Sequence, residues 1–113
     1  MSQPVVHWEI IGTDGPKLQQ FYRSLFDWQI EAVEPFNYGM MQPNGEGGIG
    51  GGIGGADAPS VTFYVQVPDL QAALSKAETL GGSTVIPPMD VMEGVQIAMF
   101  ADPDGNKIGL VRG

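Results

Sequence analysis

His7 and Glu9 are the two residues of this chain whose types and spacing suggest chemistry. They stand two positions apart in an extended run rich in β-branched and aromatic residues, so both side chains point to one face of the strand that this run predicts. Their Cα atoms are then roughly 6.5–7 Å apart. An imidazole titrates near neutral pH and can share a proton with a carboxylate, so the pair can act as acid and base or as two metal ligands.

Each residue also has an interpretation without chemistry. His7 is the only histidine in the chain, and a lone histidine can simply be hydrogen-bonded inside a sheet or to a partner. A buried carboxylate costs free energy unless it is solvated or paired, yet a water-filled cleft solvates Glu9 without any function. The residue types alone leave these alternatives open.

Composition excludes several classes of protein. The 113 residues fit one domain with its own core, and the absence of cysteine excludes disulfides and thiolate metal sites. The formal net charge of −8 argues against nucleic acid or an anionic membrane as a partner. No segment approaches the roughly 18 apolar residues of a membrane-spanning helix, and the first ten residues lack signal-peptide features. We therefore expect a cytoplasmic protein.

An internal repeat organises the chain. A shift that places Val6 over Val61 also places Asp14 over Asp69. Each copy opens with a predicted strand, and the aspartate follows at the position of a helix N-cap. Apolar residues at helical spacing come next. They are Leu18, Phe21, Tyr22 and Leu25 in the first copy, and Leu70, Ala73, Leu74, Ala77 and Leu80 in the second, whose helix should end at Gly81-Gly82.

Three short strands are predicted after each helix. They cover residues 28–34, 37–42 and about 48–54 in the first copy, and residues 83–87, 94–101 and 107–112 in the second. NGEG at residues 44–47 and DPDGNK at residues 102–107 are the turns of two hairpins. The sequence therefore predicts an α+β chain of two βαβββ modules, at residues 4–54 and 60–113, joined by a linker at residues 55–59.

Several motifs resemble a known superfamily. They are the His-x-Glu opening, FYRSLFDW at residues 21–28, the LGG and PP pairs after the second helix, and ADPDGNKIGLVR at residues 101–112. Together with the repeat, they make the chain similar to the vicinal-oxygen-chelate superfamily of glyoxalase I, bleomycin-resistance proteins and extradiol dioxygenases. Within it, the chain looks most like small glyoxalase-like proteins of unassigned activity. The resemblance implies one domain, residues 1–113, with a curved eight-stranded mixed sheet around one cleft, often in a homodimer.

The resemblance also implies a metal site that this sequence does not complete. Metal-dependent members place four ligands in the cleft, two from each module. His7 matches the first ligand, but the corresponding residue of the second module is Thr62 and the last-strand glutamate position is Gly109. The remaining glutamate position falls within residues 50–54, among glycines. Glycine has no donor and a threonine hydroxyl is a poor ligand, so His7 is the only retained ligand-type position and we expect no metal or other cofactor.

Side-chain alternation gives each strand an apolar face, which should pack under the helices, and a mixed face. Periodicity alone does not prove that the mixed face lines a pocket, because a solvent-facing sheet alternates in the same way. We predict His7 and Glu9 as candidate catalytic residues. The predicted lining of a ligand-binding cleft consists of Ile11, Tyr38, Gly51, Thr62, Tyr64, Gln66, Gly109 and Val111.

The run GEGGIGGGIGG at residues 45–55 has a place in this scheme. It lacks the Gly-Lys-Ser/Thr of a P-loop and does not open a helix as a dinucleotide-binding loop does. Ile49 and Ile53 indicate that its middle is the last strand of the first module, and a glycine-rich strand permits close approach by a ligand or another backbone. The sequence therefore predicts empty space where a metal-binding glutamate would stand.

Two classes of function remain open. The missing ligands and the mixed face favour a metal-free protein, similar to the bleomycin-resistance type, that binds an apolar or aromatic small molecule. The alternative is a lyase, isomerase or dioxygenase that uses His7 and Glu9 as acid–base or metal-binding residues. Whether the chain is an enzyme stays open at this point.

Overall fold

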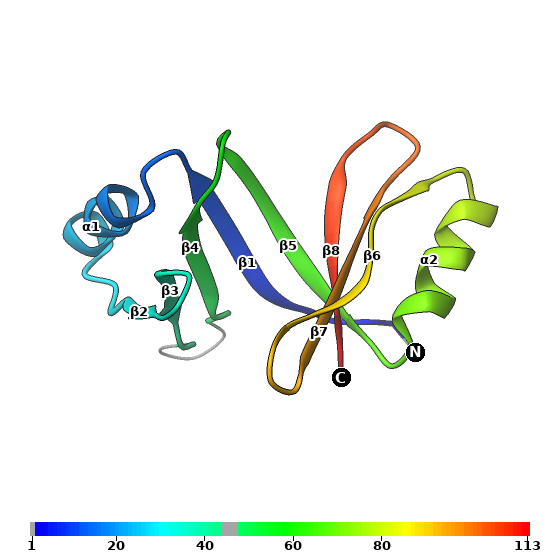
Figure 1. The fold of residues 1–113 in the computed structure, drawn as a ribbon, viewed down its shortest axis with the longest axis horizontal. Coiled ribbons are helices and arrows are strands. Elements are labelled where there is room, and N and C mark those ends of the chain that lie inside the picture. The colour runs from blue at the N-terminus through cyan, green and yellow to red at the C-terminus, as the bar shows by residue number, and fades with distance from the viewer. Residues whose placement is uncertain (1, 44–47) are drawn as a thin grey trace. The chain divides into compact units, whose positions relative to one another are not determined.

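The computed structural model describes residues 2–43 and 48–113. Along them, a strand, a helix and three further strands follow one another twice. The chain divides into two compact units: His7–Thr62 is the first unit, and Phe63–Gly113 with the described residues before His7 is the second unit. Each helix lies beside strands of its own half of the chain (Figure 1). Among the described residues, no helix is both long and apolar enough to cross a bilayer.

The first module packs one face of its strands against its helix. Its strands lie in the order β2-β3-β4-β1, with β4 parallel to β1 and antiparallel to β3. Ile30, Met41 and Ile53 form the buried core, and side chains of β1 and α1 pack around it. The elements are β1 (Val5–Gly12), α1 (Gly15–Phe26), β2 (Glu31–Val33), β3 (Tyr38–Met41) and β4 (Gly51–Gly55).

The second module repeats this arrangement. Its strands lie in the order β5-β8-β7-β6, with β8 parallel to β5. Leu70 and Leu74 of the helix are buried with Val67, Ala98 and Leu110 of the strands. The elements are β5 (Ser60–Val67), α2 (Leu70–Thr79), β6 (Ser83–Met92), β7 (Val95–Ala101) and β8 (Lys107–Arg112). The predicted α+β class with two βαβββ modules and eight strands is confirmed.

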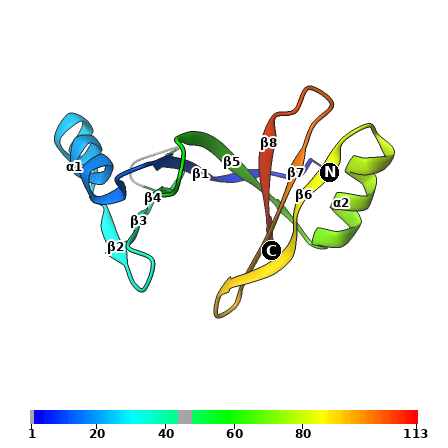
Figure 2. The same ribbon diagram turned by 45° about the horizontal axis from the view of Figure 1, so that its top comes forward.

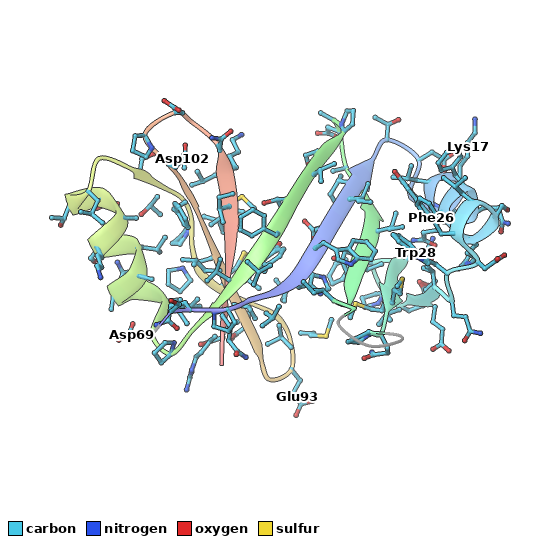
Figure 3. All side chains as sticks on the ribbon, turned by 180° about the vertical axis from the view of Figure 1, so that it is seen from behind. Lys17, Phe26, Trp28, Asp69, Glu93 and Asp102 are labelled. Carbon is cyan, nitrogen blue, oxygen red and sulfur yellow. The ribbon has the colours of Figure 1, made fainter. Side chains whose placement is uncertain are left out.

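The helix boundaries follow from the residues predicted for them. The Asp14 carboxylate accepts a hydrogen bond from the Lys17 backbone N–H at 3.1 Å, and that of Asp69 accepts one from the Ala72 N–H at 3.0 Å. Both aspartates satisfy a backbone donor that a first turn leaves unpaired. Asp69 is labelled at the start of α2 in Figure 3. At the end of α2, Gly81 adopts a φ of 102°, which a glycine reaches without strain.

Two strands, β6 and β2, differ most in length from the prediction. β6 continues to Met92, whereas the sequence predicted its end at residue 87, and it pairs with β7 along a hairpin visible in Figure 2. Its register shifts between Ile86 and Met89, across the two prolines. Proline has no N–H for the ladder, so the strand passes it as an irregularity rather than ending there. β2 is shorter than predicted and begins at Glu31, and Trp28, which precedes it, packs against the core residues.

The turn between β7 and β8 is confirmed. The Asp102 carboxylate accepts hydrogen bonds from the backbone N–H groups of Asp104 and Asn106, and Gly105 has a φ of 89°. The Asn106 side chain donates to the same carboxylate, which lowers the pKa of Asp102. Figure 3 labels Asp102 in this turn. The other predicted turn, NGEG, lies outside the described residues.

Candidate functional site

Strand β1 carries the predicted chemistry on one face and core residues on the other. Trp8 and Ile10 pack against the core cluster that includes Leu18 of α1. Successive side chains of a strand alternate, so His7 and Glu9 lie on the face turned away from this helix. Both are half-buried. The packing of Trp8 and Ile10 against the core thus agrees with the side-chain alternation predicted for β1.

Tyr38 of β3 joins His7 to Glu9 through its hydroxyl. The Tyr38 Oη lies 3.0 Å from His7 Nε2 and donates a hydrogen bond to Glu9 Oε2 at 2.8 Å. The imidazole and phenol rings are nearly parallel, with 22° between their planes. We call His7, Tyr38 and Glu9 the trio. The sequence placed all three among the site residues but gave no indication that a phenol connects the other two.

The glycines of β4 make this connection possible. β4 lies between β1 and β3, and Gly52 is paired with Glu9 on one side and with Met40 on the other. A β-carbon on Gly52 would lie 2.0 Å from both Cζ and Oη of Tyr38, and one on Gly54 would lie 3.0 Å from its Cδ1. The Tyr38 ring therefore rests on a strand without side chains and reaches across it to β1.

The glycine on the trio's face is Gly52, not Gly51. A β-carbon on Gly51 would lie 2.0 Å from Cδ2 of Trp8, whose indole belongs to the helix-packed core. The Trp8 indole N–H also donates to the Ile49 carbonyl at 2.7 Å. Gly51 was predicted to line the ligand cleft, but strand alternation turns it towards the core and turns its neighbour towards Tyr38.

The other predicted lining residues belong partly to the first unit and partly to the second unit. In the first unit, Ile11 has its Cδ1 3.5 Å from the β-carbon position of Gly54, on the trio's face, and Thr62 is half-buried at the end of that unit. In the second unit, the Tyr64 ring covers Gly109, where a β-carbon would lie 2.5 Å from Cδ2. Gln66 and Val111 are paired neighbours on β5 and β8. Their common role as a cleft lining stays a prediction.

Gln19 of α1 holds the backbone next to Tyr38 and next to Gly52. Its side chain is 2% exposed, and its amide donates to the carbonyls of Asn37 and Ile53 at 3.0 and 2.9 Å. Asn37 directly precedes Tyr38, and Ile53 separates Gly52 from Gly54. Gln19 was not among the predicted site residues. A glutamine between Leu18 and an exposed Gln20 has no distinguishing pattern, because its acceptors come from other elements.

Burial lowers the pKa of the His7 imidazole below its ordinary value of 6.5, because the protonated form loses solvation. Between that value and the lower folded pKa, the unfolded chain binds a proton that the folded chain does not. The free energy of unfolding should therefore decrease as the pH falls through this window. Above it His7 is neutral in both states and contributes no pH dependence.

This pH dependence can be measured by comparing the wild type with His7→Gln. We expect urea denaturation between about pH 7.5 and about pH 5.5 to show a steeper loss of stability for the wild type than for the variant. His7 is the only histidine, so the difference in slope reports this residue while the carboxylates cancel. Parallel slopes would contradict a lowered pKa.

The residues around His7 do not fit the four-ligand metal site that the resemblance implied. Within residues 2–43 and 48–113, no group of three or more His, Asp or Glu side chains could hold a metal ion. The space that a side chain at position 52 would use is filled by the Tyr38 phenol, and the space at Gly109 by the Tyr64 ring. Neither ring offers the carboxylate that such a site needs.

A depression in the second unit lies outside the predicted lining. It has a volume of about 630 Å³ and adjoins the ends of β6, β7 and β8. One of its residues, Arg112, donates a hydrogen bond to Gln96 at 3.0 Å. Its lining consists of Pro68, Asp90, Gly94, Gln96, Arg112 and Gly113. None of these residues was predicted to belong to the site.

Solved structures share the fold over the whole chain. A variant of Streptomyces coelicolor methylmalonyl-CoA epimerase in complex with 2-nitronate-propionyl-CoA is 16% identical, with a TM-score of 0.68 and 99% of both chains covered. The hypothetical protein BH1468 from Bacillus halodurans C-125 is 13% identical, with a TM-score of 0.73, and covers 100% of this chain and 96% of its own. At these identities the likeness is one of fold alone.

Sequence relatives and a family profile point the same way. "Putative glyoxylase CFP32" of Mycobacterium bovis is 28% identical over an alignment of 107 residues, and the match covers 87% of this chain and 41% of that protein. "Anthracycline biosynthesis protein DauV" of Streptomyces sp. strain C5 is 37% identical over 51 residues, 45% of this chain and 18% of that protein. The chain thus spans well under half the length of these relatives. Since the profile matches residues 5–110, the chain belongs to the Glyoxalase/Bleomycin resistance protein/Dioxygenase superfamily.

Proposed function

We propose that the protein binds an apolar or aromatic small molecule without a metal ion, in the manner of a bleomycin-resistance-type protein. The observation that carries this proposal is the Tyr38 phenol, which lies over Gly52 and is hydrogen-bonded to both His7 and Glu9. The Tyr38 ring thus fills the space that a metal-binding side chain at position 52 would need. The trio supplies polar groups that can orient a ligand, as small-molecule sites require.

The kind of ligand follows from what surrounds the trio. Ile11 and Met40 lie on the same face of the first module, beside the Tyr38 ring. Flat apolar surfaces with a few convergent polar groups suit aromatic compounds. Two relatives support a small molecule as the partner, since the epimerase structure contains 2-nitronate-propionyl-CoA and the DauV protein is named for anthracycline biosynthesis.

A ligand screen in the presence of a chelator tests this proposal. With EDTA present, an aromatic compound at one hundred times its Kd should raise the free energy of unfolding by about 2.7 kcal/mol. Glu9→Gln should weaken binding by about tenfold or more, because hydrogen bonds to charged groups contribute about 1.5–3 kcal/mol. Glu78→Gln is the matched control, since Glu78 bonds Thr84 on the surface of the second module. Its affinity should equal that of the wild type.

Two results would contradict the proposal. The first is a panel of aromatic compounds of which none stabilises the protein. The second is stoichiometric Ni, Zn, Fe or Mn in the purified protein that disappears in His7→Ala, because the trio would then be part of a metal site.

A second candidate is an enzyme that uses His7 and Glu9 as acid and base. The chain of hydrogen bonds from His7 through Tyr38 to Glu9 favours it, because a proton can be passed between groups so connected. Burial also lowers the pKa of His7, so the imidazole is neutral at pH 7 and has one unprotonated nitrogen that can accept a proton. Turnover of a bound compound that is lost in Glu9→Gln while binding is retained would favour this candidate over binding alone.

A further inference from the structure

The hydrogen bonds of the trio determine which nitrogen of His7 carries its hydrogen. A phenol carries one proton, which it can donate once, while its oxygen accepts. Tyr38 donates this proton to Glu9 Oε2 at 2.8 Å. Its oxygen can therefore only accept from His7, whose Nε2 lies 3.0 Å away. The hydrogen on the His7 ring must then be on Nε2.

We propose that Tyr38 is a positioning residue, which fixes neutral His7 as the Nε2–H tautomer and so makes Nδ1 its basic nitrogen. The inference rests on the proposed site but not on any ligand, since it concerns hydrogen bonds already present in the protein. A histidine that orients a ligand or accepts a proton does so through the nitrogen that its other neighbour leaves unprotonated. Tyr38 thereby decides which nitrogen of His7 carries the hydrogen.

Gly52 is the second half of this device. Its β-carbon position lies 2.0 Å from Tyr38 Oη, so even an alanine methyl group must displace the hydroxyl from the point where it contacts both partners. The opposite boundary is set by α1, because the Gln19 amide holds the carbonyl of Asn37, the residue before Tyr38. The hydrogen bond from Gln19 thus holds the backbone before Tyr38, and the missing side chain of Gly52 leaves room for the Tyr38 ring.

Two variants attack the contact from opposite sides. Tyr38→Phe keeps the ring and removes the hydroxyl, whereas Gly52→Ala keeps the hydroxyl and displaces the ring. Tyr22→Phe is the matched control, because Tyr22 packs at the α1 core and stacks on Trp28, outside the trio. With one histidine in the chain, the nitrogen signals of its imidazole need no assignment.

The experiment is a long-range ¹H–¹⁵N correlation spectrum of the ¹⁵N-labelled, ligand-free protein at about pH 8.5, where His7 is neutral. We expect the wild type and Tyr22→Phe to show the Nε2–H tautomer in at least about tenfold excess, which corresponds to about 1.4 kcal/mol. In Tyr38→Phe and in Gly52→Ala this excess should fall several-fold. Backbone amide spectra of each variant establish that it is folded.

The outcomes separate cleanly. An Nδ1–H tautomer in the wild type would overturn the proposal, because Glu9 would then hold the proton and Tyr38 would donate to His7. An excess that persists in Tyr38→Phe would also overturn it, and this variant decides alone if Gly52→Ala does not fold. A protein that shows the expected tautomers but binds no aromatic compound would retain Tyr38 in this role while the proposed function fails.

Discussion

Replacing Ile53 with alanine should lower the free energy of unfolding by about 2–5 kcal/mol, the largest effect we expect from a single truncation in the first module. Ile53 is 0% exposed and packs with Ile30 and Met41 under α1. The residues that share its face of β4, Gly51 and Gly55, are glycines, which cannot move a side chain into the cavity that the truncation leaves. Urea or guanidinium denaturation with the two-state analysis measures the difference.

The matched control lies in the same glycine-rich run. Ile49 is 45% exposed, and its contact with Trp8 is made by its backbone carbonyl, which alanine retains. We expect Ile49→Ala to cost less than about 1 kcal/mol. Equal losses for Ile49→Ala and Ile53→Ala would mean that the run behaves as a linker rather than as a packed strand.

Gln19→Ala should lower the free energy of unfolding by about 2–4 kcal/mol, which is the second-largest effect that we expect. It removes a buried amide and leaves the carbonyls of Asn37 and Ile53 without this donor, and an orphaned buried polar group costs about 1–3 kcal/mol. Gln20→Ala on the same helix turn is the control, since the exposed Gln20 bonds only Ser24 among its described partners. We expect it to change stability by at most about 0.5 kcal/mol.

A functional consequence accompanies this loss of stability. Because Asn37 precedes Tyr38, the Gln19→Ala variant should also shift the His7 imidazole signals while it remains folded. The same spectrum of Gln20→Ala should be that of the wild type. A Gln19→Ala protein with unchanged stability and unchanged His7 signals would show that α1 does not position the trio.

The glycines of strand β4 leave room for two aromatic rings, one on each face. Gly51 lies under Trp8 on the core side, and Gly52 lies under Tyr38 on the side of the trio. A side chain at either position would displace a ring that makes a hydrogen bond, to the Ile49 carbonyl in one case and to Glu9 in the other. β4 lies between β1 and β3, and because its glycines have no side chains, residues of β1 and β3 can contact each other across it.

The two modules use the repeat differently. The shift that superimposes Asp14 on Asp69 places Glu9 on Tyr64. In the second module, this tyrosine itself covers the glycine of the neighbouring strand, Gly109. In the first module, the carboxylate of Glu9 is retained and the ring comes from β3 instead. The glycine paired with Glu9 and the glycine paired with Tyr64 are thus both covered by a tyrosine ring, but only the first module has a hydrogen-bonded acid at this position.

Much of the fold could be read from local signals in the sequence. The N-cap aspartates, Gly81 after α2 and the DPDGNK turn each satisfy backbone groups within a few residues, so their pattern predicts the boundary directly. The length of β6 could not be read in this way. Whether a strand ends or bends at a pair of prolines depends on the partner strand that continues beside it, here β7.

The sequence by itself determined the module repeat, the face of β1 on which His7 and Glu9 lie, and the absence of ligand side chains from the glycine positions. The tertiary structure alone decided that Tyr38 fills that space and links the two residues, that Gly52 rather than Gly51 lies beneath it, and that Gln19 holds it. The physical reason is distance along the chain. Alternation and capping act between near neighbours, whereas the trio joins β1 to β3 across β4 and exists only once the strands are ordered side by side.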